Sequence, residues 1–175
     1  MSDLVLKPAW HLADPAIERD AELFWRALKN PAARFDVDAR RAELCGAAYL
    51  GGKLVGISTA EPRRIPRLRC KLVMYRTLVS REVRKQDIAS KLAVFSRDLL
   101  ETWSRENPQE EILGVGAVIQ SRALVENIPL PVYPDTKLSL FGYTQEGFQM
   151  RVYWFAHARI STYWPGDAVG ESSEG

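Results

Sequence analysis

A long amphipathic helix that directly follows an apolar, strand-like run constrains the fold of this chain more than any other feature. Five large apolar side chains recur at helical spacing within residues 85–105, namely Ile88, Leu92, Phe95, Leu99 and Trp103. Residues 72–79, just upstream, form an apolar run typical of a buried strand, and Asn107-Pro108 ends the helix. A helix with one apolar face buries that face on another element, so the sequence predicts a helix packed on a sheet.

The other patterns predict a mixed order of helices and strands after a short first strand. Asp14-Pro15 opens a helix that Asn30-Pro31 ends. The apolar runs 44–50 and 53–59 are joined by Gly51-Gly52, which is typical of a tight hairpin because glycine adopts positive φ. The remaining expected elements are a short helix over 38–43, a strand over 112–119, a short helix over 121–127, and strands over 136–143 and 148–158. Hairpins at both ends favour an α+β fold with a mixed sheet over a doubly wound parallel sheet.

Composition limits the domain organisation and the partners. The 175 residues suffice for one domain, assigned to residues 1–164, and the small, acidic stretch 165–175 is expected to be a disordered tail. Two cysteines and two histidines without ligand spacing predict no metal site. The net charge of +2 argues against nucleic acid as a partner. No apolar run reaches the roughly 20 residues that span a bilayer, so no membrane is expected. The first residues lack a secretory pattern, which predicts a cytoplasmic protein.

The residues between the strand 72–79 and the long helix carry the strongest indication of chemistry. A helix N-terminus presents unpaired N–H groups and a partial positive charge, which suit a phosphate or pyrophosphate. Arg84 and Lys85 add positive charge at the same place. The alternative is an ordinary polar turn, because strand-to-helix connections are commonly polar and basic.

Residues 84–89, Arg-Lys-Gln-Asp-Ile-Ala, resemble the acetyl-CoA motif of the GNAT acetyltransferase superfamily, and the order of elements over residues 4–160 is similar to that of the family. The family motif is Gln or Arg, two residues, Gly, one residue, then Gly or Ala. Arg84 and Ala89 match it, whereas Asp87 replaces the usual Gly. The resemblance implies the GNAT-like acyl-CoA N-acyltransferase fold, with a mostly antiparallel sheet of about seven strands and flanking helices.

The resemblance also implies acetyl-CoA as the cosubstrate. Backbone groups at the end of the fourth strand are expected to pair with the pantetheine arm, and main-chain N–H groups of the turn to hold the pyrophosphate. The implied binding residues are Leu78, Val79, Arg84, Lys85, Gln86, Asp87, Ile88 and Ala89. A carboxylate that faced the pyrophosphate would repel it, so we expect Asp87 to point outward and interact with the N-terminus of its own helix.

Acetyl transfer to an amine requires a group that removes the amine proton and a group that protonates the leaving thiolate. In the family a carboxylate and a tyrosine often fill these roles. Glu61, just after the expected third strand, is the candidate base, and the alternative is an exposed loop charge before Pro62. Tyr133, which follows the fifth strand and the short helix, is the candidate acid. The alternative is that Tyr133 only packs within its proline-rich loop.

The resemblance therefore implies an enzyme that moves an acetyl group from acetyl-CoA to an unidentified primary amine, on a small molecule or peptide, by direct attack. The alternative is a non-catalytic acyl-CoA-binding or protein-interaction module on the same fold, favoured by Asp87 and the lack of an obvious base. A basic loop is expected over 62–71, either solvated or steering an anionic group of a ligand, with Arg63, Arg64, Arg67, Arg69 and Lys71. The oligomeric state is open between a monomer and a homodimer.

Overall fold

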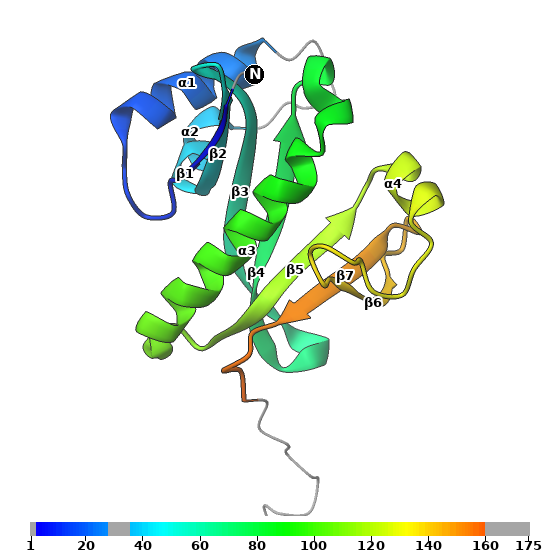
Figure 1. Ribbon diagram of the computed structural model, residues 1–175. Coiled ribbons are helices and arrows are strands. Elements are labelled where there is room, and N and C mark those ends of the chain that lie inside the picture. The colour runs from blue at the N-terminus through cyan, green and yellow to red at the C-terminus, as the bar shows by residue number, and fades with distance from the viewer. Residues whose placement is uncertain (1–2, 28–35, 160–175) are drawn as a thin grey trace, which may run out of the picture.

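The computed structural model describes residues 3–27 and 36–159, so the expected tail at 165–175 lies outside the described residues. Within them, a seven-stranded sheet runs in the order β1-β2-β3-β4-β5-β7-β6 (Figure 1). The strands are β1 (Leu4–Pro8), β2 (Leu44–Leu50), β3 (Lys53–Ile65), β4 (Cys70–Val79), β5 (Ile112–Ile119), β6 (Ser139–Tyr143) and β7 (Gln149–Trp154). Neighbouring strands are antiparallel except for the parallel pair β4 and β5. The predicted α+β fold with a mixed, mostly antiparallel sheet is confirmed.

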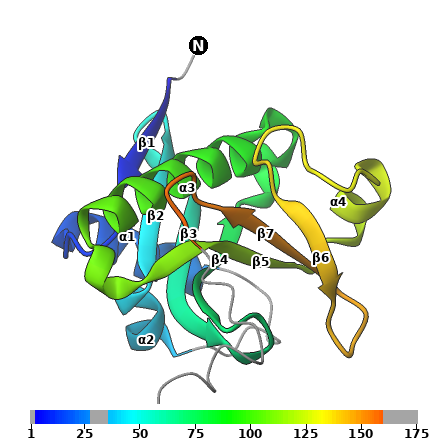
Figure 2. The ribbon, with the colours of Figure 1, turned by 90° about the horizontal axis from the view of Figure 1, so that it is seen from below.

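Four α-helices in the described part of the chain flank the sheet. They are α1 (Pro15–Arg26), α2 (Val37–Ala42), α3 (Ile88–Glu106) and α4 (Arg122–Asn127), and the short 3-10 helices are η1 (Pro66–Leu68), η2 (Arg81–Gln86) and η3 (Pro108–Glu110). Figure 2 shows α3 and α2 on opposite sides of the sheet. No helix among the described residues is both long and apolar enough to cross a membrane.

Local signals in the sequence account for where several elements begin and end. The side chain of Asp14 accepts hydrogen bonds from the backbone N–H groups of Ala16 and Ile17, at 2.9 and 3.3 Å, and so caps α1. Gly51 and Gly52 both adopt positive φ, 57° and 79°, and close the predicted hairpin between β2 and β3.

The helix α3 covers one face of the sheet, with a buried line that differs from the predicted apolar stripe. The buried residues are Ile88, Leu92, Ser96, Leu100 and Ser104. Ser96 lies 2.8 Å from the Ser58 hydroxyl of β3, and Ser104 donates to the Ile112 carbonyl at 2.8 Å. The two serines face the sheet because they have hydrogen-bond partners there, so hydrophobicity alone mispredicted the most buried side of this helix.

The helix α1 covers the opposite face. Its buried residues Ile17, Ala21 and Trp25 share a core cluster with Ile57 of β3. Successive residues of a strand face opposite sides of the sheet, so Ile57 points away from α3 while Ser58 points toward it.

The stretch 62–71, expected as a basic loop, is instead the end of a long hairpin. The strand β3 continues to Ile65 and pairs with β4 through Ile65↔Cys70, and only η1 with Arg69 forms the turn. The pairing of β2 with β3 ends at Thr59, and the Ala60 N–H donates to the Glu43 carbonyl at 2.8 Å. Beyond this point no strand among residues 3–27 and 36–159 pairs with the other edge of β3. The missing N–H of Pro62 would point to that edge, where a strand tolerates proline.

Candidate active site

The sheet opens as a wedge between β4 and β5, and we use this name for the gap that their diverging ends enclose. The two strands pair through Val73↔Val115 and Met74↔Gly116, after which each follows its other neighbour. β4 stays paired with β3 up to Val79↔Gly56, and β5 stays paired with β7 up to Ile119↔Gln149. Figure 1 shows the two arrows separating. Successive residues of a strand direct their backbone N–H and C=O groups to opposite edges, so every second residue of β4 beyond Met74 presents these groups to the wedge. The Ser80 N–H donates to the Val55 carbonyl of β3 at 2.8 Å, so at this end of β4 the backbone groups of Val79 face the wedge, whereas those of Leu78 face β3.

The chain turns from the β4 arm of the wedge directly into α3. Ser80 leads into η2, and Asp87 is the N-cap residue of α3. The first N–H groups of an α-helix have no intrahelical partner, so those of α3 are presented at this turn. Gln86 and Ala89 are exposed and Ile88 is buried, whereas the side chains of Arg84 and Lys85 lie outside what the structure describes. The turn thus combines a helix N-terminus with an adjacent gap in the sheet.

Asp87 adopts the left-handed backbone conformation that usually calls for glycine. Its φ is 58° and its ψ is 21°. This conformation explains why the motif has Gly at this position, because Gly reaches positive φ freely. Asp can replace Gly here because it is among the few other residues that tolerate positive φ. The side chain of Asp87 is exposed and makes no capping hydrogen bond to α3. The interaction that we expected between Asp87 and the N-terminus of its own helix is therefore not a capping hydrogen bond, and whether its carboxylate faces a bound pyrophosphate stays a prediction.

Tyr133 lies in the loop between α4 and β6 and packs against the β5 arm of the wedge. It is 5% exposed and shares a cluster with Ala117 and Leu138. Ala117 is the residue of β5 that follows the last β4–β5 pair, and it faces α3, as Val115 does. The Tyr133 hydroxyl is buried and has no hydrogen-bond partner among the described residues. Burial raises the pKa of this phenol, and the nearby positive charge of Arg151 opposes that rise.

Glu61 lies within β3, not after it as the sequence indicated. It pairs with Met74, so it stands level with the apex of the wedge, on the face opposite α3. Its carboxylate contacts Arg63 at 2.9 Å and Arg76 at 3.5 Å. The hydrogen bond from Arg63, together with the charges of both arginines, lowers the pKa of Glu61 despite its partial burial. Glu61 is therefore ionised at neutral pH and is a weaker base than a free glutamate.

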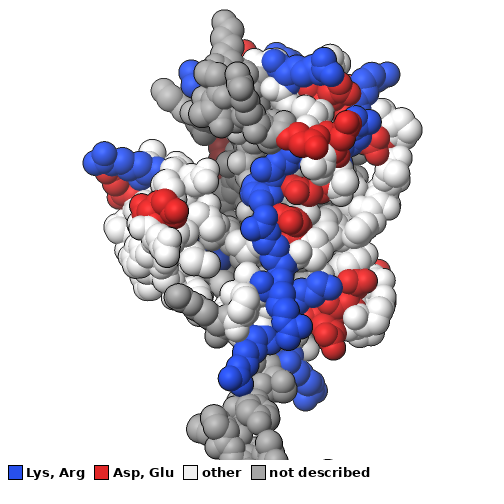
Figure 3. Space-filling model, turned by 180° about the vertical axis from the view of Figure 1, so that it is seen from behind, with Lys and Arg blue, Asp and Glu red and all other residues white. Residues whose placement is uncertain are grey.

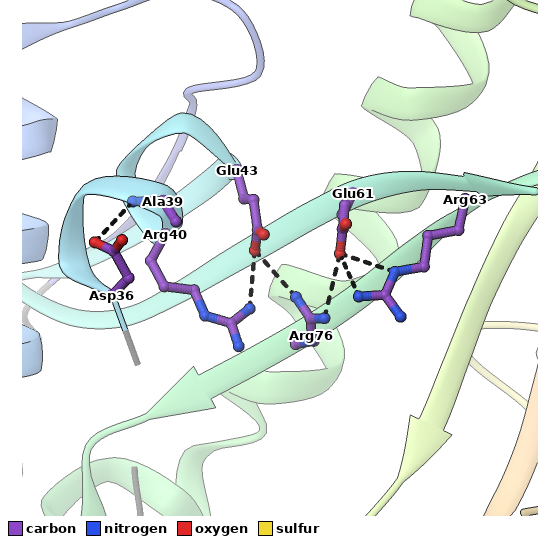
Figure 4. A network of polar contacts seen from close by, with 7 residues as sticks. All are labelled: Asp36, Ala39, Arg40, Glu43, Glu61, Arg63 and Arg76. Atoms are coloured by element: carbon purple, nitrogen blue, oxygen red, sulfur yellow. Dashed lines mark hydrogen bonds and ion pairs between the residues drawn. The ribbon is translucent and has the colours of Figure 1, made fainter. Parts of the chain in front are cut away.

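The carboxylate of Glu61 belongs to a ladder of alternating charges. Arg76 of β4 also contacts Glu43 at 3.0 Å, and Glu43 in turn contacts Arg40 of α2 at 2.8 Å (Figure 4). On the face behind α3, basic side chains form a band with acidic side chains along one side (Figure 3). The ladder joins α2 to β3 and β4 and presents paired charges beside the wedge.

The strand register places Glu61 and Tyr133, which are far apart in the sequence, level with the apex of the wedge, but on opposite faces of the sheet and without a contact between them. Glu61 reaches the apex of the wedge from one face, and Tyr133 lies one residue past the apex on the other. The sequence reasoning missed Arg151 of β7, whose guanidinium carbon lies 3.6 Å from the centre of the Tyr133 ring. A signal was present, because Arg151 interrupts an otherwise apolar strand end, Met150 to Trp154. Among residues 3–27 and 36–159, no three His, Cys, Asp or Glu side chains form a group able to hold a metal ion.

The sequence matches no known protein family, and it matches no curated protein. The fold, in contrast, is similar to many solved structures. One is AtaTR bound with acetyl-CoA, with a TM-score of 0.61 at 15% identity, covering 89% of this chain and 95% of that chain. Another is the loading GNATL domain of CurA from Lyngbya majuscula, with a TM-score of 0.59 at 12% identity, covering 89% and 99%.

A GNAT-family acetyltransferase from Streptococcus pneumoniae is also similar, with a TM-score of 0.55 at 13% identity, covering 87% of this chain and 99% of that chain. At these identities the likeness concerns the fold. The chain has the GNAT acyl-CoA N-acyltransferase fold, and the fold predicted from the resemblance is confirmed.

Proposed function

We propose that this protein transfers the acetyl group of acetyl-CoA to a primary amine on a small molecule or a peptide. The observation that carries the proposal is the wedge, which opens beside the N-terminus of α3 at the motif turn. A pantetheine arm is an extended chain with amide groups, and the edge of β4 that faces the wedge beyond Met74 offers it strand-like hydrogen bonds. The N-terminus of α3 offers a pyrophosphate unpaired N–H groups and a partial positive charge. The solved AtaTR structure, which shares the fold, holds acetyl-CoA.

The proposed reaction is direct attack without a covalent enzyme intermediate. The amine nitrogen bonds to the thioester carbonyl carbon, the C–S bond breaks, and its electron pair leaves on sulfur. The amine loses one proton to a base and the thiolate gains one from an acid. Glu61 is the proposed base, acting through water, and Tyr133 is the proposed acid. Their positions at the apex of the wedge, on opposite faces of the sheet, support a division of the site into an acceptor side and a cosubstrate side.

The acceptor is proposed to enter on the face opposite α3, where Glu61, Glu43 and Arg76 lie (Figure 4). The lowered pKa of Glu61 means that it takes a proton from an ammonium only weakly. Its ionised carboxylate also attracts the ammonium form of an amine toward the wedge. Deprotonation then depends on the pKa of the amine, so turnover is expected to rise with pH toward the pKa of the acceptor.

The test of binding uses two matched substitutions. Ala89 and Ala16 are exposed and each is the second residue of its helix, in α3 and α1. Glutamate at either place gains about 0.3–1 kcal/mol from the helix dipole, so neither Ala89→Glu nor Ala16→Glu should harm folding. Acetyl-CoA at about 100 times its Kd should stabilise the wild type by about 2.7 kcal/mol, or roughly 5–10 °C in Tm. We expect Ala16→Glu to keep this shift and Ala89→Glu to lose most of it.

The test of catalysis is the release of free thiol from acetyl-CoA when a panel of amines is offered. Thiol release that depends on the amine supports the enzyme, whereas a Tm shift without thiol release supports the non-catalytic acyl-CoA-binding alternative. Equal Tm shifts in Ala89→Glu and Ala16→Glu would show that acetyl-CoA does not bind at the turn before α3. A wild type with neither a Tm shift nor thiol release would overturn the proposed function.

A further inference from the structure

Arg151 is a buried arginine without an acidic partner. It is 1% exposed, and it forms no ion pair with a carboxylate in the part of the chain that the structure describes. A buried charge is costly unless hydrogen bonds replace the water that it has lost. Its N–H groups donate to neutral oxygens only: Nε to Gln149 Oε1 at 2.9 Å, and the two Nη atoms to the carbonyls of Leu130, Pro131 and Leu138 at 2.8, 3.2 and 3.2 Å.

These carbonyls lie on both sides of Tyr133 in the chain. The Arg151 guanidinium therefore holds both ends of the segment 130–138 by hydrogen bonds, with Tyr133 between them in the chain. The segment closes on itself as well, since the Tyr133 N–H donates to the Leu138 carbonyl at 3.0 Å and the Lys137 N–H donates to the Tyr133 carbonyl at 2.9 Å. The planar fork of arginine suits this arrangement, because it serves several acceptors in fixed directions.

The guanidinium also lies over the face of the Tyr133 ring, 3.6 Å from its centre. Ala117 and Leu138 pack against the same ring, so its position relative to β5 is fixed. The Tyr133 hydroxyl, in contrast, is buried without a partner among the described residues. A buried, unpartnered hydroxyl costs free energy, so its presence in a well-anchored side chain calls for an explanation.

We propose that Arg151 is a positioning residue that holds Tyr133 at the wedge and compensates the charge on its oxygen when Tyr133 gives its proton to the leaving thiolate. This inference rests on the proposed function. In the step, the C–S electron pair goes to sulfur, the Tyr133 O–H bond breaks, and its proton forms the S–H bond of coenzyme A. The resulting phenolate lies beside the guanidinium until water returns a proton. The cation favours the phenolate, which makes the buried phenol a better acid than burial alone would allow.

Other charged groups face this loop from neighbouring elements, but they contact different side chains. From α3, Arg97 lies over the Tyr153 ring at 4.8 Å, and Glu101 accepts a hydrogen bond from the Tyr153 hydroxyl at 3.1 Å. Asp135 of the loop accepts from Ser90 at 2.8 Å. Arg97 also donates to the carbonyls of Asp135 and Thr136, at 3.3 and 2.9 Å. Arg97 is thus a matched control, because it anchors the same loop without contacting Tyr133.

The test measures the pKa of the Tyr133 phenol by ultraviolet difference titration, with the Tyr133→Phe chain as the reference. Arg151→Met removes the cation and keeps much of the volume, so we expect the phenol pKa to rise further while the ring stays buried. Arg97→Met should leave it unchanged. A fall toward about 10, the value of an exposed phenol, would mean that Arg151 only clamps the loop and would overturn the inference. Equal responses to Arg151→Met and Arg97→Met would also overturn it.

Arg151→Lys keeps the charge and decides the question should Arg151→Met fail to fold. We expect a lower Tm, because an ammonium does not serve three carbonyls, with the phenol pKa near its wild-type value. A phenol pKa near 10 in Arg151→Lys contradicts the inference.

Kinetics separate the inference from the proposed function on which it rests. If the wild type shows no acetyl transfer, the proposed function fails, and the titration still reports whether Arg151 sets the acidity of Tyr133. If the wild type is active, Arg151→Met should lower turnover in wild type but cause no further loss in the Tyr133→Phe background. Additive losses in the double variant would overturn the inference, since the two residues would then act independently.

Discussion

Replacing Asp87 separates the conformational role of this position from its charge. With φ at 58°, an ordinary L-residue here bears a cost of roughly 1–2 kcal/mol, which Asp reduces and Gly avoids. Asp87→Ala should therefore destabilise the protein by about 1 kcal/mol. Asp87→Gly relieves strain but adds freedom to the unfolded chain, a penalty of about 0.4–1 kcal/mol, so its stability should stay within about 1 kcal/mol of the wild type. Asp87→Asn keeps the left-handed tolerance and removes only the charge.

Thermal unfolding checks the order of stability. For a chain of 175 residues, about 1 kcal/mol corresponds to roughly 2–4 °C in Tm, so the Ala variant should melt visibly below the Gly and Asn variants. Ala89→Gly is the matched control, because Ala89 is the second residue of α3 and has a helical backbone, where glycine relieves no strain and costs at most about 1 kcal/mol. Glycine should thus be tolerated at position 87 and destabilising two residues later. If Asp87→Ala were as stable as Asp87→Gly, the left-handed conformation assigned to Asp87 would be refuted.

Acetyl-CoA binding by the same variants checks the charge. Two unit charges about 10 Å apart interact by about 1.7 kcal/mol at an effective dielectric constant near 20, and screening over one Debye length at about 0.1 M salt reduces this to about 0.6 kcal/mol. Asp87→Asn and Asp87→Gly should then tighten acetyl-CoA binding alike, by roughly threefold. If only Asp87→Gly tightened acetyl-CoA binding, the effect would come from a closer approach of the residue 87 backbone to the pyrophosphate and not from the loss of charge. Unchanged affinity in both variants would mean that the Asp87 carboxylate is remote from the pyrophosphate.

Three further outcomes follow from the geometry. Tyr133→Phe should lower turnover by a factor on the order of 10² to 10⁴ and leave the acetyl-CoA shift in Tm intact; turnover like wild type would make Tyr133 a packing residue. Glu61→Gln should cost well under about 1 kcal/mol at neutral pH, because the side chain is 34% exposed. Since the folded pKa of Glu61 is lowered, its stabilisation is present above the unfolded pKa and lost as pH falls through the folded pKa, so urea titrations of the two proteins should converge in acid; a gap that persisted in acid would contradict this. Gly114→Ala should destabilise by about 1–3 kcal/mol in urea unfolding, because its Cβ would meet the Tyr153 carbonyl oxygen at 2.3 Å, whereas Gly142→Ala, with no described heavy atom within 4 Å, should not.

Much of the fold could be predicted from the sequence because its elements carry their own local patterns. The bounds predicted for two strands, 44–50 and 112–119, agree with those of β2 and β5. The hairpin at Gly51-Gly52 follows from the φ values that only glycine adopts freely. The long helix follows from its apolar period, although it begins at Ile88, after a 3-10 turn, and not at residue 85. The turn between β4 and α3 could also be predicted from the sequence, because residues 78–89 are contiguous.

The conformation of individual site residues was harder to predict from the sequence. Asp87 stood out in the sequence as a departure from glycine, but its left-handed backbone emerged only from how β4, η2 and α3 meet. Glu61 was predicted to lie just after the third strand, because the apolar run 53–59 ends before it. The pairing of β3 with β4 on a single edge allows the strand to continue through Pro62.

The sequence by itself determined the helices, the strands and the hairpin, because each is specified by residues close together in the chain. Only the tertiary structure decided that Ser96 faces the core, that Glu61 and Tyr133 lie level with the wedge, and that Arg151 stacks on Tyr133. The physical reason is that a buried polar or charged group is stable only where partners satisfy it. The carbonyls that accept hydrogen bonds from Arg151 lie 13 to 21 residues away along the chain, so no local sequence pattern predicts these contacts.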